Sequence, residues 1–253
     1  MLANAATSSY AQTNIQLYNQ LQETGYAGED LACVRSAYEL ALRLFAGRVL
    51  SSGRVFLAHV IGAASILASV KASGRVVAAA LLHNAYKNGD FGDGEPGVTH
   101  ERRRYISDAV GTELEAYVHR YYSMSWETKV VRALPEQLPQ LSTMDREVVT
   151  IFLADNLEKF VDMNLLYGSN SQRVLAFFER TGPAQIAIAQ GLGLPELAAE
   201  FETQWKAAQT RTLPPELRAA SEQKNSSILA PASYRPRLGL RWHHLWRKWR
   251  SQD

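Results

Sequence analysis

Apolar residues recur at intervals of three and four along most of this chain, the spacing that places side chains on one face of an α-helix. In residues 30–45 the repeat runs through Leu31, Val34, Tyr38, Leu42 and Phe45. The same period predicts helices over 10–24, 54–71, 74–86, 99–111, near 114–118, over 143–161 after a Ser or Thr cap, and near 170–180, 183–190 and 195–208. β-Branched runs are short and fall inside these patterns. The sequence therefore predicts an all-α helical bundle.

The composition divides the chain into three parts. Residues 1–209 carry the helical periodicity, whereas 210–237 are rich in Pro, Ser, Asn and Gln and read as a linker over the surface. Residues 238–253 form an amphipathic tail, whose apolar positions Leu238, Trp242, Leu245, Trp246 and Trp249 share one helical face between basic residues. Two interpretations of this tail stay open: it docks on the protein's own body, or it lies in an anionic membrane interface.

Charge and cysteine content limit the class of protein. The formal net charge is +2, but six Lys and Arg residues fall in the last nineteen positions, and no nucleic-acid partner is expected for the body. Cys33 is the only cysteine, which excludes an internal disulfide and fits a reducing compartment. The first residues lack a secretory signal pattern, and no apolar run is long enough to span a membrane. We expect a cytoplasmic protein, with peripheral membrane attachment as the alternative for the tail.

Three ligand-type side chains interrupt otherwise apolar helical patterns. His59 lies in FLAHVIGAASIL, His83 in AAALLHN and Asp155 in IFLADNLEKFVD. Burying such a group without a partner costs about 1 to 3 kcal/mol, so each must be hydrogen-bonded, paired or bound to metal. Three such groups on three helices predict one shared site, and imidazole and carboxylate are ligand types that suit Mn, Fe or Zn. The alternative for Asp155 is a surface salt bridge to Lys159, one turn further on.

These stretches resemble the HD-domain superfamily of metal-dependent phosphohydrolases. SGRVFLAHVIGAASIL (52–67), AAALLHN (78–84) and LADNLEK (153–159) are similar, in order and spacing, to its three ligand-bearing motifs. The nearest variant is the guanosine tetraphosphate hydrolase domain of the RelA/SpoT type, and the resemblance covers about residues 45–165. It implies an HD-like helical bundle in which His59, His83 and Asp155 hold a divalent metal.

The chain departs from that family at the second motif. Asn84 stands where the family has the Asp of its His-Asp pair, so it would be a weak neutral fourth ligand or a hydrogen-bond donor. Lys87 and Asn88 stand where the hydrolases have a Glu-Asp pair that serves the attacking water. The expected function is a metal-dependent hydrolase acting on a phosphorylated small molecule or nucleotide. The alternative is a ligand-binding or scaffold protein that keeps the HD fold and has lost hydrolysis.

Further polar residues near the second motif are candidates for substrate chemistry. Arg54, Lys87 and Asn88 are candidates for holding substrate phosphates, with solvated surface residues as the alternative. Asp90 is a candidate to orient water, and Lys87 is the second candidate catalytic residue. Asp90 and Asp93 lie in the glycine-rich segment 89–97, however, where turn formation is the competing explanation.

Overall fold

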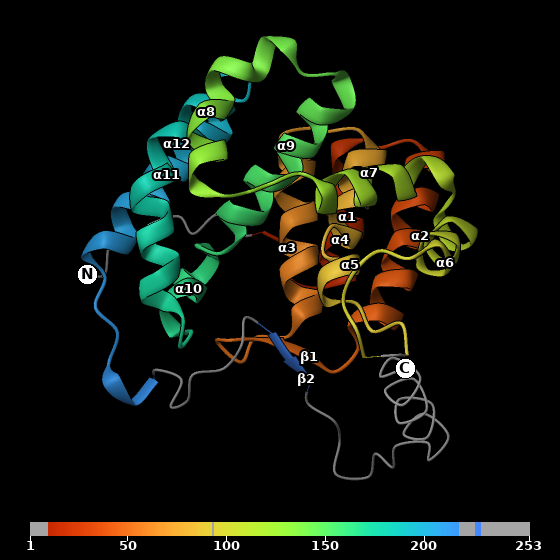
Figure 1. Cartoon of the computed structure of the whole chain (residues 1–253), viewed down its shortest axis with the longest axis horizontal. Helices are drawn as coiled ribbons and strands as arrows, with labels where there is room; N and C mark the ends of the chain where they lie inside the picture. The colour runs from red at the N-terminus through yellow and green to blue at the C-terminus, as the bar shows by residue number, and fades with distance from the viewer. Residues whose placement is uncertain (1–9, 93, 218–225, 229–253) are drawn as a thin grey trace, which may run out of the picture.

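The computed structural model describes residues 10–92, 94–217 and 226–228, and these ranges fold almost entirely into helices (Figure 1). The predicted all-α class is confirmed, and the predicted tail over 238–253 lies outside the described residues. The α-helices are α1 (Asn14–Thr24), α2 (Gly28–Phe45), α3 (Phe56–Ser69), α4 (Gly74–Leu82), α5 (Ala85–Asn88), α6 (His100–Val110), α7 (Thr112–Ser123), α8 (Thr128–Gln137), α9 (Thr143–Glu158), α10 (Asn164–Tyr167), α11 (Ser171–Gly191) and α12 (Pro195–Thr210). Short 3₁₀ helices cover Leu138–Gln140, Val161–Met163 and Pro215–Leu217.

Helix α3 lies at the centre of this bundle, where it packs against α1, α2, α4 and α9. Every residue of α3 from His59 to Ala68 is buried. A helix that is apolar on all sides is stable only when other helices cover each face, and the four neighbours provide that cover. A polar side chain between His59 and Ala68 is therefore enclosed by the rest of the protein, whichever way it points.

Side-chain caps fix where two of the three ligand-bearing helices, α4 and α9, begin. The Ser73 hydroxyl accepts from the Val76 N–H at 3.4 Å at the start of α4, and the Ser142 hydroxyl accepts from the Asp145 N–H at 3.1 Å at the start of α9. The predicted helix over 74–86 is interrupted, because α4 ends at Leu82 and α5 begins only after Asn84. This break turns the chain at the end of α4.

A second group of helices, α8, α11 and α12, lies to one side of the bundle (Figure 1). The prediction of two helices near 170–180 and 183–190 was wrong, since α11 continues through Pro183. Pro183 removes one backbone donor from this helix, but α11 packs against both α8 and α12, and that burial maintains it. Pro135 also lies inside a helix, α8. An aromatic cluster of Phe160, Phe178 and Phe201 ties α9's end to this group.

One small sheet joins distant parts of the chain. Strand β1 (Arg48–Leu50) pairs antiparallel with β2 (Ser226–Ile228), with Val49 opposite Ser227. Strand β2 falls inside the segment predicted as a linker over the surface, and three residues of that segment pair with β1. The pairing places them beside the turn that leads from β1 into α3.

Candidate functional site

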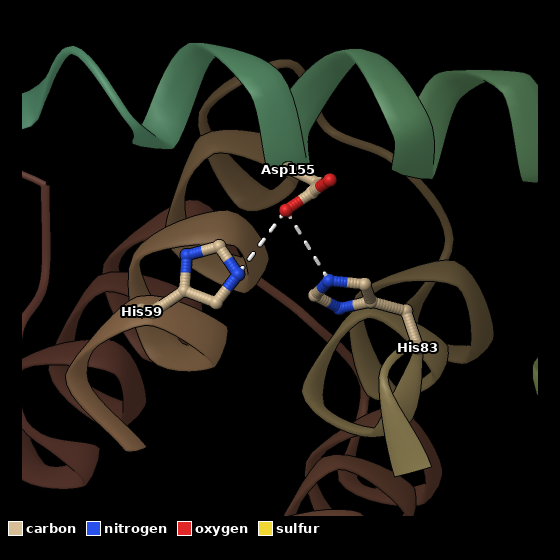
Figure 2. A group of neighbouring side chains, drawn as sticks. All are labelled: His59, His83 and Asp155. Atoms are coloured by element: carbon tan, nitrogen blue, oxygen red, sulfur yellow. Dashed lines mark ion pairs between the residues drawn. The ribbon is translucent and has the colours of Figure 1, made fainter. Parts of the chain in front are cut away.

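The structure brings His59, His83 and Asp155 together from three helices. Their potential ligand atoms all lie within 4.8 Å of one another, and all three residues are buried. Asp155 Oδ1 is 3.1 Å from His59 Nε2 and 3.4 Å from His83 Nε2 (Figure 2). His59 comes from the first turn of α3, His83 caps the C-terminus of α4, and Asp155 lies in the last turn of α9. The expected convergence of these residues is therefore present, while metal binding stays a prediction.

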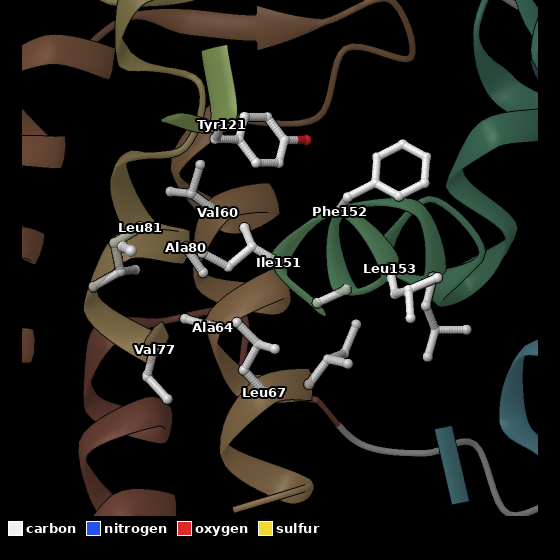
Figure 3. Close-up of a cluster of buried hydrophobic side chains, with 14 of the residues drawn as sticks. Val60, Ala64, Leu67, Val77, Ala80, Leu81, Tyr121, Ile151, Phe152 and Leu153 are labelled. Atoms are coloured by element: carbon white, nitrogen blue, oxygen red, sulfur yellow. The ribbon is translucent and has the colours of Figure 1, made fainter. Parts of the chain in front are cut away.

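A close-packed apolar core holds the three helices around this cluster. Figure 3 shows Val60 and Ala64 of α3 facing Ala80 of α4 and Ile151 of α9. These residues are almost completely buried. Interiors packed to this density resist small displacements, so the helices act as rigid supports for the polar side chains.

Each histidine is oriented by a partner on its other ring nitrogen. His59 Nδ1 contacts the carboxylate of Glu158, and His83 Nδ1 donates to the Ala80 carbonyl oxygen at 2.6 Å. Metal-ligating histidines characteristically donate one N–H to a carboxylate or a backbone carbonyl, which fixes the ring and leaves the other nitrogen for the metal. In both histidines here the Nδ1 atom has such a partner, and the Nε2 atom points toward Asp155.

The carboxylate of Asp155 is held in a similar manner. Its Oδ2 accepts from the Tyr121 hydroxyl at 3.1 Å and from Lys159 Nζ at 3.0 Å, which leaves Oδ1 to face the histidines. Burial opposes ionisation, but the Lys159 ammonium and the two imidazoles hold the pKa of Asp155 well below its usual value. The predicted pairing of Asp155 with Lys159 does occur, as a part-buried contact at the site rather than a surface salt bridge.

Two of the three distances between the candidate ligand atoms fit the geometry of a divalent metal site, and all three atoms lie within 4.8 Å of one another. Ligand atoms about 2.1 Å from a Zn-like ion stand roughly 3.0 to 3.4 Å apart in octahedral or tetrahedral arrangements. The distances of 3.1 and 3.4 Å from Asp155 to the two histidines lie in this range. Two imidazoles and one carboxylate also leave coordination positions open, as catalytic sites require.

Protons can satisfy the same atoms when metal is absent. Burial lowers the pKa of His59, but the carboxylates of Glu158 and Asp155 on either side outweigh this and raise it to about 9. The resulting imidazolium donates to both acids. Asn84 Nδ2 lies 2.6 Å from His83 Nε2, so Asn84 takes the hydrogen-bond donor role, one of the two roles that its sequence position allowed. A metal would have to displace this contact and the His59 proton.

The cluster forms part of the wall of a cavity of about 480 Å³. One side of this cavity is aromatic, and Trp126 and Phe152 stack there with ring centroids 4.2 Å apart. Another part is polar and positively charged; its residues are Ser51, Ser52, Asn84, Lys87, Asn88, Asn156, Lys159, Asn164, Asn170 and Arg173. The cavity thus combines an aromatic surface with cationic and amide donors.

The other predicted site residues divide into two groups. Lys87 and Asn88 line the cavity, as a substrate-binding role requires. Arg54 does not line the cavity, because its guanidinium forms an ion pair with Glu158. The prediction that Arg54 contacts substrate was therefore wrong. Asp90 is also outside the lining, and its carboxylate accepts from the Gly92 N–H at 2.8 Å, which is the turn-forming alternative. Asp93 lies outside the described residues.

Sequence reasoning missed Glu158, whose side chain is completely buried beside His59. The signal was present in the motif IFLADNLEKFVD, where Glu158 follows Asp155 by three residues and so shares its helical face. A second signal was Gly62, one turn beyond His59. A Cβ at position 62 would lie 2.8 Å from Glu158 Cγ, so only glycine leaves room for this carboxylate.

Comparison with known families adds one match. Residues 42–125, about a third of the chain, are similar to a family described as a domain of unknown function (DUF6817). The matched stretch contains His59 and His83, whereas Asp155 lies beyond it. No curated protein matches the chain. Within the described ranges, every helix is too short or too polar to cross a bilayer.

Proposed function

We propose that this protein is a divalent-metal-dependent hydrolase, similar to the HD superfamily, that acts on a phosphorylated small molecule or nucleotide. The observation that supports the proposal is the convergence of the candidate ligand atoms of His59, His83 and Asp155 within 4.8 Å of one another in the wall of a cationic cavity. His59, His83 and Asp155 would hold the metal. A bound divalent ion would supply Lewis acidity and lower the pKa of water.

The cavity lining supports a phosphorylated ligand. Lys87 and Arg173 can neutralise phosphate charge from the polar side of the cavity, and Asn88 adds an amide donor. The stacked Trp126 and Phe152 offer a surface on which a planar base can pack. Lys159 is already engaged with Asp155 and Asn156, at 3.0 and 2.8 Å, and serves the cluster itself.

A second candidate function is ligand binding without hydrolysis, and two observations favour it. Asn84 donates to His83 in place of supplying an anionic ligand. Among the described residues that line the cavity, Asp155 alone is acidic, so no second carboxylate stands ready to accept a proton from water. In this alternative the cationic cavity retains the phosphorylated ligand and leaves it intact.

Metal analysis and ligand assays on the same preparation separate these candidates. The hydrolase proposal expects about one Mn, Fe or Zn ion per chain, lost in Asp155→Ala, and metal-dependent phosphate release from a panel of nucleotides and sugar phosphates. Binding of a panel member with no turnover, whether or not metal is present, would support the second candidate. Protein that takes up no metal even when incubated with each ion would refute the hydrolase proposal.

A further inference from the structure

Glu158 occupies an unusual position for a charged residue. It is the last residue of α9, and its side chain has no exposed surface. One carboxylate oxygen, Oε2, contacts His59 Nδ1, and the other, Oε1, forms the ion pair with Arg54 Nη1. Burying a carboxylate is costly unless charged or hydrogen-bonding partners surround it. Here Oε2 has the His59 ring nitrogen and Oε1 has the Arg54 guanidinium as an ion-pair partner.

The packing of α3 against α9 is shaped around this carboxylate. Position 62 is glycine, and a Cβ there would lie 2.8 Å from both Cγ and Oε1 of Glu158. The two helices thus approach at the one residue of α3 that has no side chain. Asp155 and Glu158, one turn apart on α9, contact opposite nitrogens of the same imidazole.

We propose that Glu158 is a positioning residue, which holds the His59 ring so that Nδ1–H faces α9 and Nε2 faces His83 and Asp155, while Arg54 holds the Glu158 carboxylate in place. The part of this inference that concerns metal affinity rests on the proposed function. The part that concerns ring orientation does not, because the contacts exist in the protein alone. Arg54, predicted as a substrate contact, would then act on the site indirectly, by holding Glu158.

The chain contains a matched control for a purely structural role. Glu115 is also buried, and Arg103 donates to its two oxygens at 2.8 and 2.7 Å, while Tyr86 donates at 2.5 Å. This pair joins α6 to α7 and touches none of the three candidate ligands. Glu115→Gln therefore removes a buried carboxylate from its pair with a part-exposed Arg without altering His59.

The experiment compares wild-type protein with Glu158→Gln, Gly62→Ala and Glu115→Gln. Gly62→Ala leaves the Glu158 charge intact but pushes its carboxylate away from His59. Affinity for Zn²⁺ and Co²⁺ is measured by chelator competition, and the Co²⁺ absorption spectrum reports ligand geometry. Loss of an outer-shell partner typically weakens metal binding about 10- to 100-fold. We expect that loss and an altered Co²⁺ spectrum in Glu158→Gln and Gly62→Ala, with Glu115→Gln equal to wild type.

A metal-free measurement keeps this inference separate from the proposed function. In metal-free wild-type protein, NMR should show a downfield, slowly exchanging hydrogen on His59 Nδ1, absent or shifted in Glu158→Gln and in Gly62→Ala and present in Glu115→Gln. If the wild type binds no metal but shows this signal, the metal proposal fails and the positioning role stands. An unchanged Nδ1 signal in whichever of Glu158→Gln and Gly62→Ala folds, or equal metal affinity in that variant and Glu115→Gln, would overturn the positioning role.

Discussion

Replacing Asn84 by Asp restores the anionic ligand that the HD-like pattern lacks. Asn84 Nδ2 lies 2.6 Å from His83 Nε2, and Asp155 Oδ1 lies 3.4 Å from the same nitrogen. A carboxylate at position 84 therefore faces the open side of the three-ligand cluster. It would be a fourth ligand for a bound metal, and in metal-free protein it would repel Asp155.

The magnitude follows from these two distances. Atoms 2.6 and 3.4 Å from one nitrogen are separated by about 6 Å at most, where two unit charges interact by roughly 3 kcal/mol at an effective dielectric constant of about 20. An interaction of that size corresponds to about a hundredfold in affinity. Asn84→Asp should thus lower the free energy of unfolding in chelator by roughly 3 kcal/mol or more. Because a bound cation relieves this repulsion, the affinity for Mn²⁺ or Zn²⁺ should rise by at least about a hundredfold.

Two measurements on the variant test this reasoning together. Chelator competition gives the metal affinity, and urea unfolding with and without EDTA gives the stability of each form. Asn88→Asp is the matched control, because it adds the same charge to the cavity lining at a residue that is not one of the three candidate ligands, and it should change both quantities less. If Asn84→Asp matched the wild type in metal affinity and in chelator stability, residues His59, His83 and Asp155 would not form a metal site.

Two more predictions concern pH and the C-terminal tail. The folded pKa of His59, about 9, lies above its ordinary value of 6.5, so its proton stabilises metal-free protein fully below pH 6.5, and this contribution is lost as the pH rises through 9. In urea unfolding with EDTA, the free energy of unfolding of the wild type should fall by on the order of 3 kcal/mol more than that of His59→Gln between pH 6 and 10. If the free energies of the two proteins changed in parallel with pH, the raised pKa of His59 would be contradicted. Deleting residues 238–253 should abolish sedimentation with anionic vesicles and leave the melting temperature nearly unchanged if the tail is a peripheral anchor. A lowered melting temperature in a protein whose full-length form ignores vesicles would favour a tail docked on the body.

The sequence alone determined the fold class and the three central residues of the site. Helical periodicity is a local property, because side chains three and four apart share a face wherever the backbone is helical. A polar group inside such a pattern must find a partner in the core, and His59, His83 and Asp155 could be singled out on that ground. Their convergence was an inference from residue type, and it holds in the structure.

The helix boundaries around proline were not determined locally. Pro183 and Pro135 predict interruptions from propensity, yet both lie inside helices that bury one face against others. Tertiary packing provides more free energy than one lost backbone hydrogen bond costs. At Asn84 the structure has an interruption that the sequence did not predict, because the run predicted as one helix is divided into α4 and α5.

Only the tertiary structure decided which polar residues belong to the site. By charge and position, Arg54 was predicted to contact substrate and Asp90 to orient water. In the structure, Arg54 forms an ion pair with Glu158, and the Asp90 carboxylate accepts from the Gly92 N–H within its own turn. Glu158 reaches His59 because Gly62 lets two helices, separated by almost a hundred residues of chain, come into contact. Periodicity places a side chain on a face of its own helix, whereas its partner depends on how that helix packs against the others.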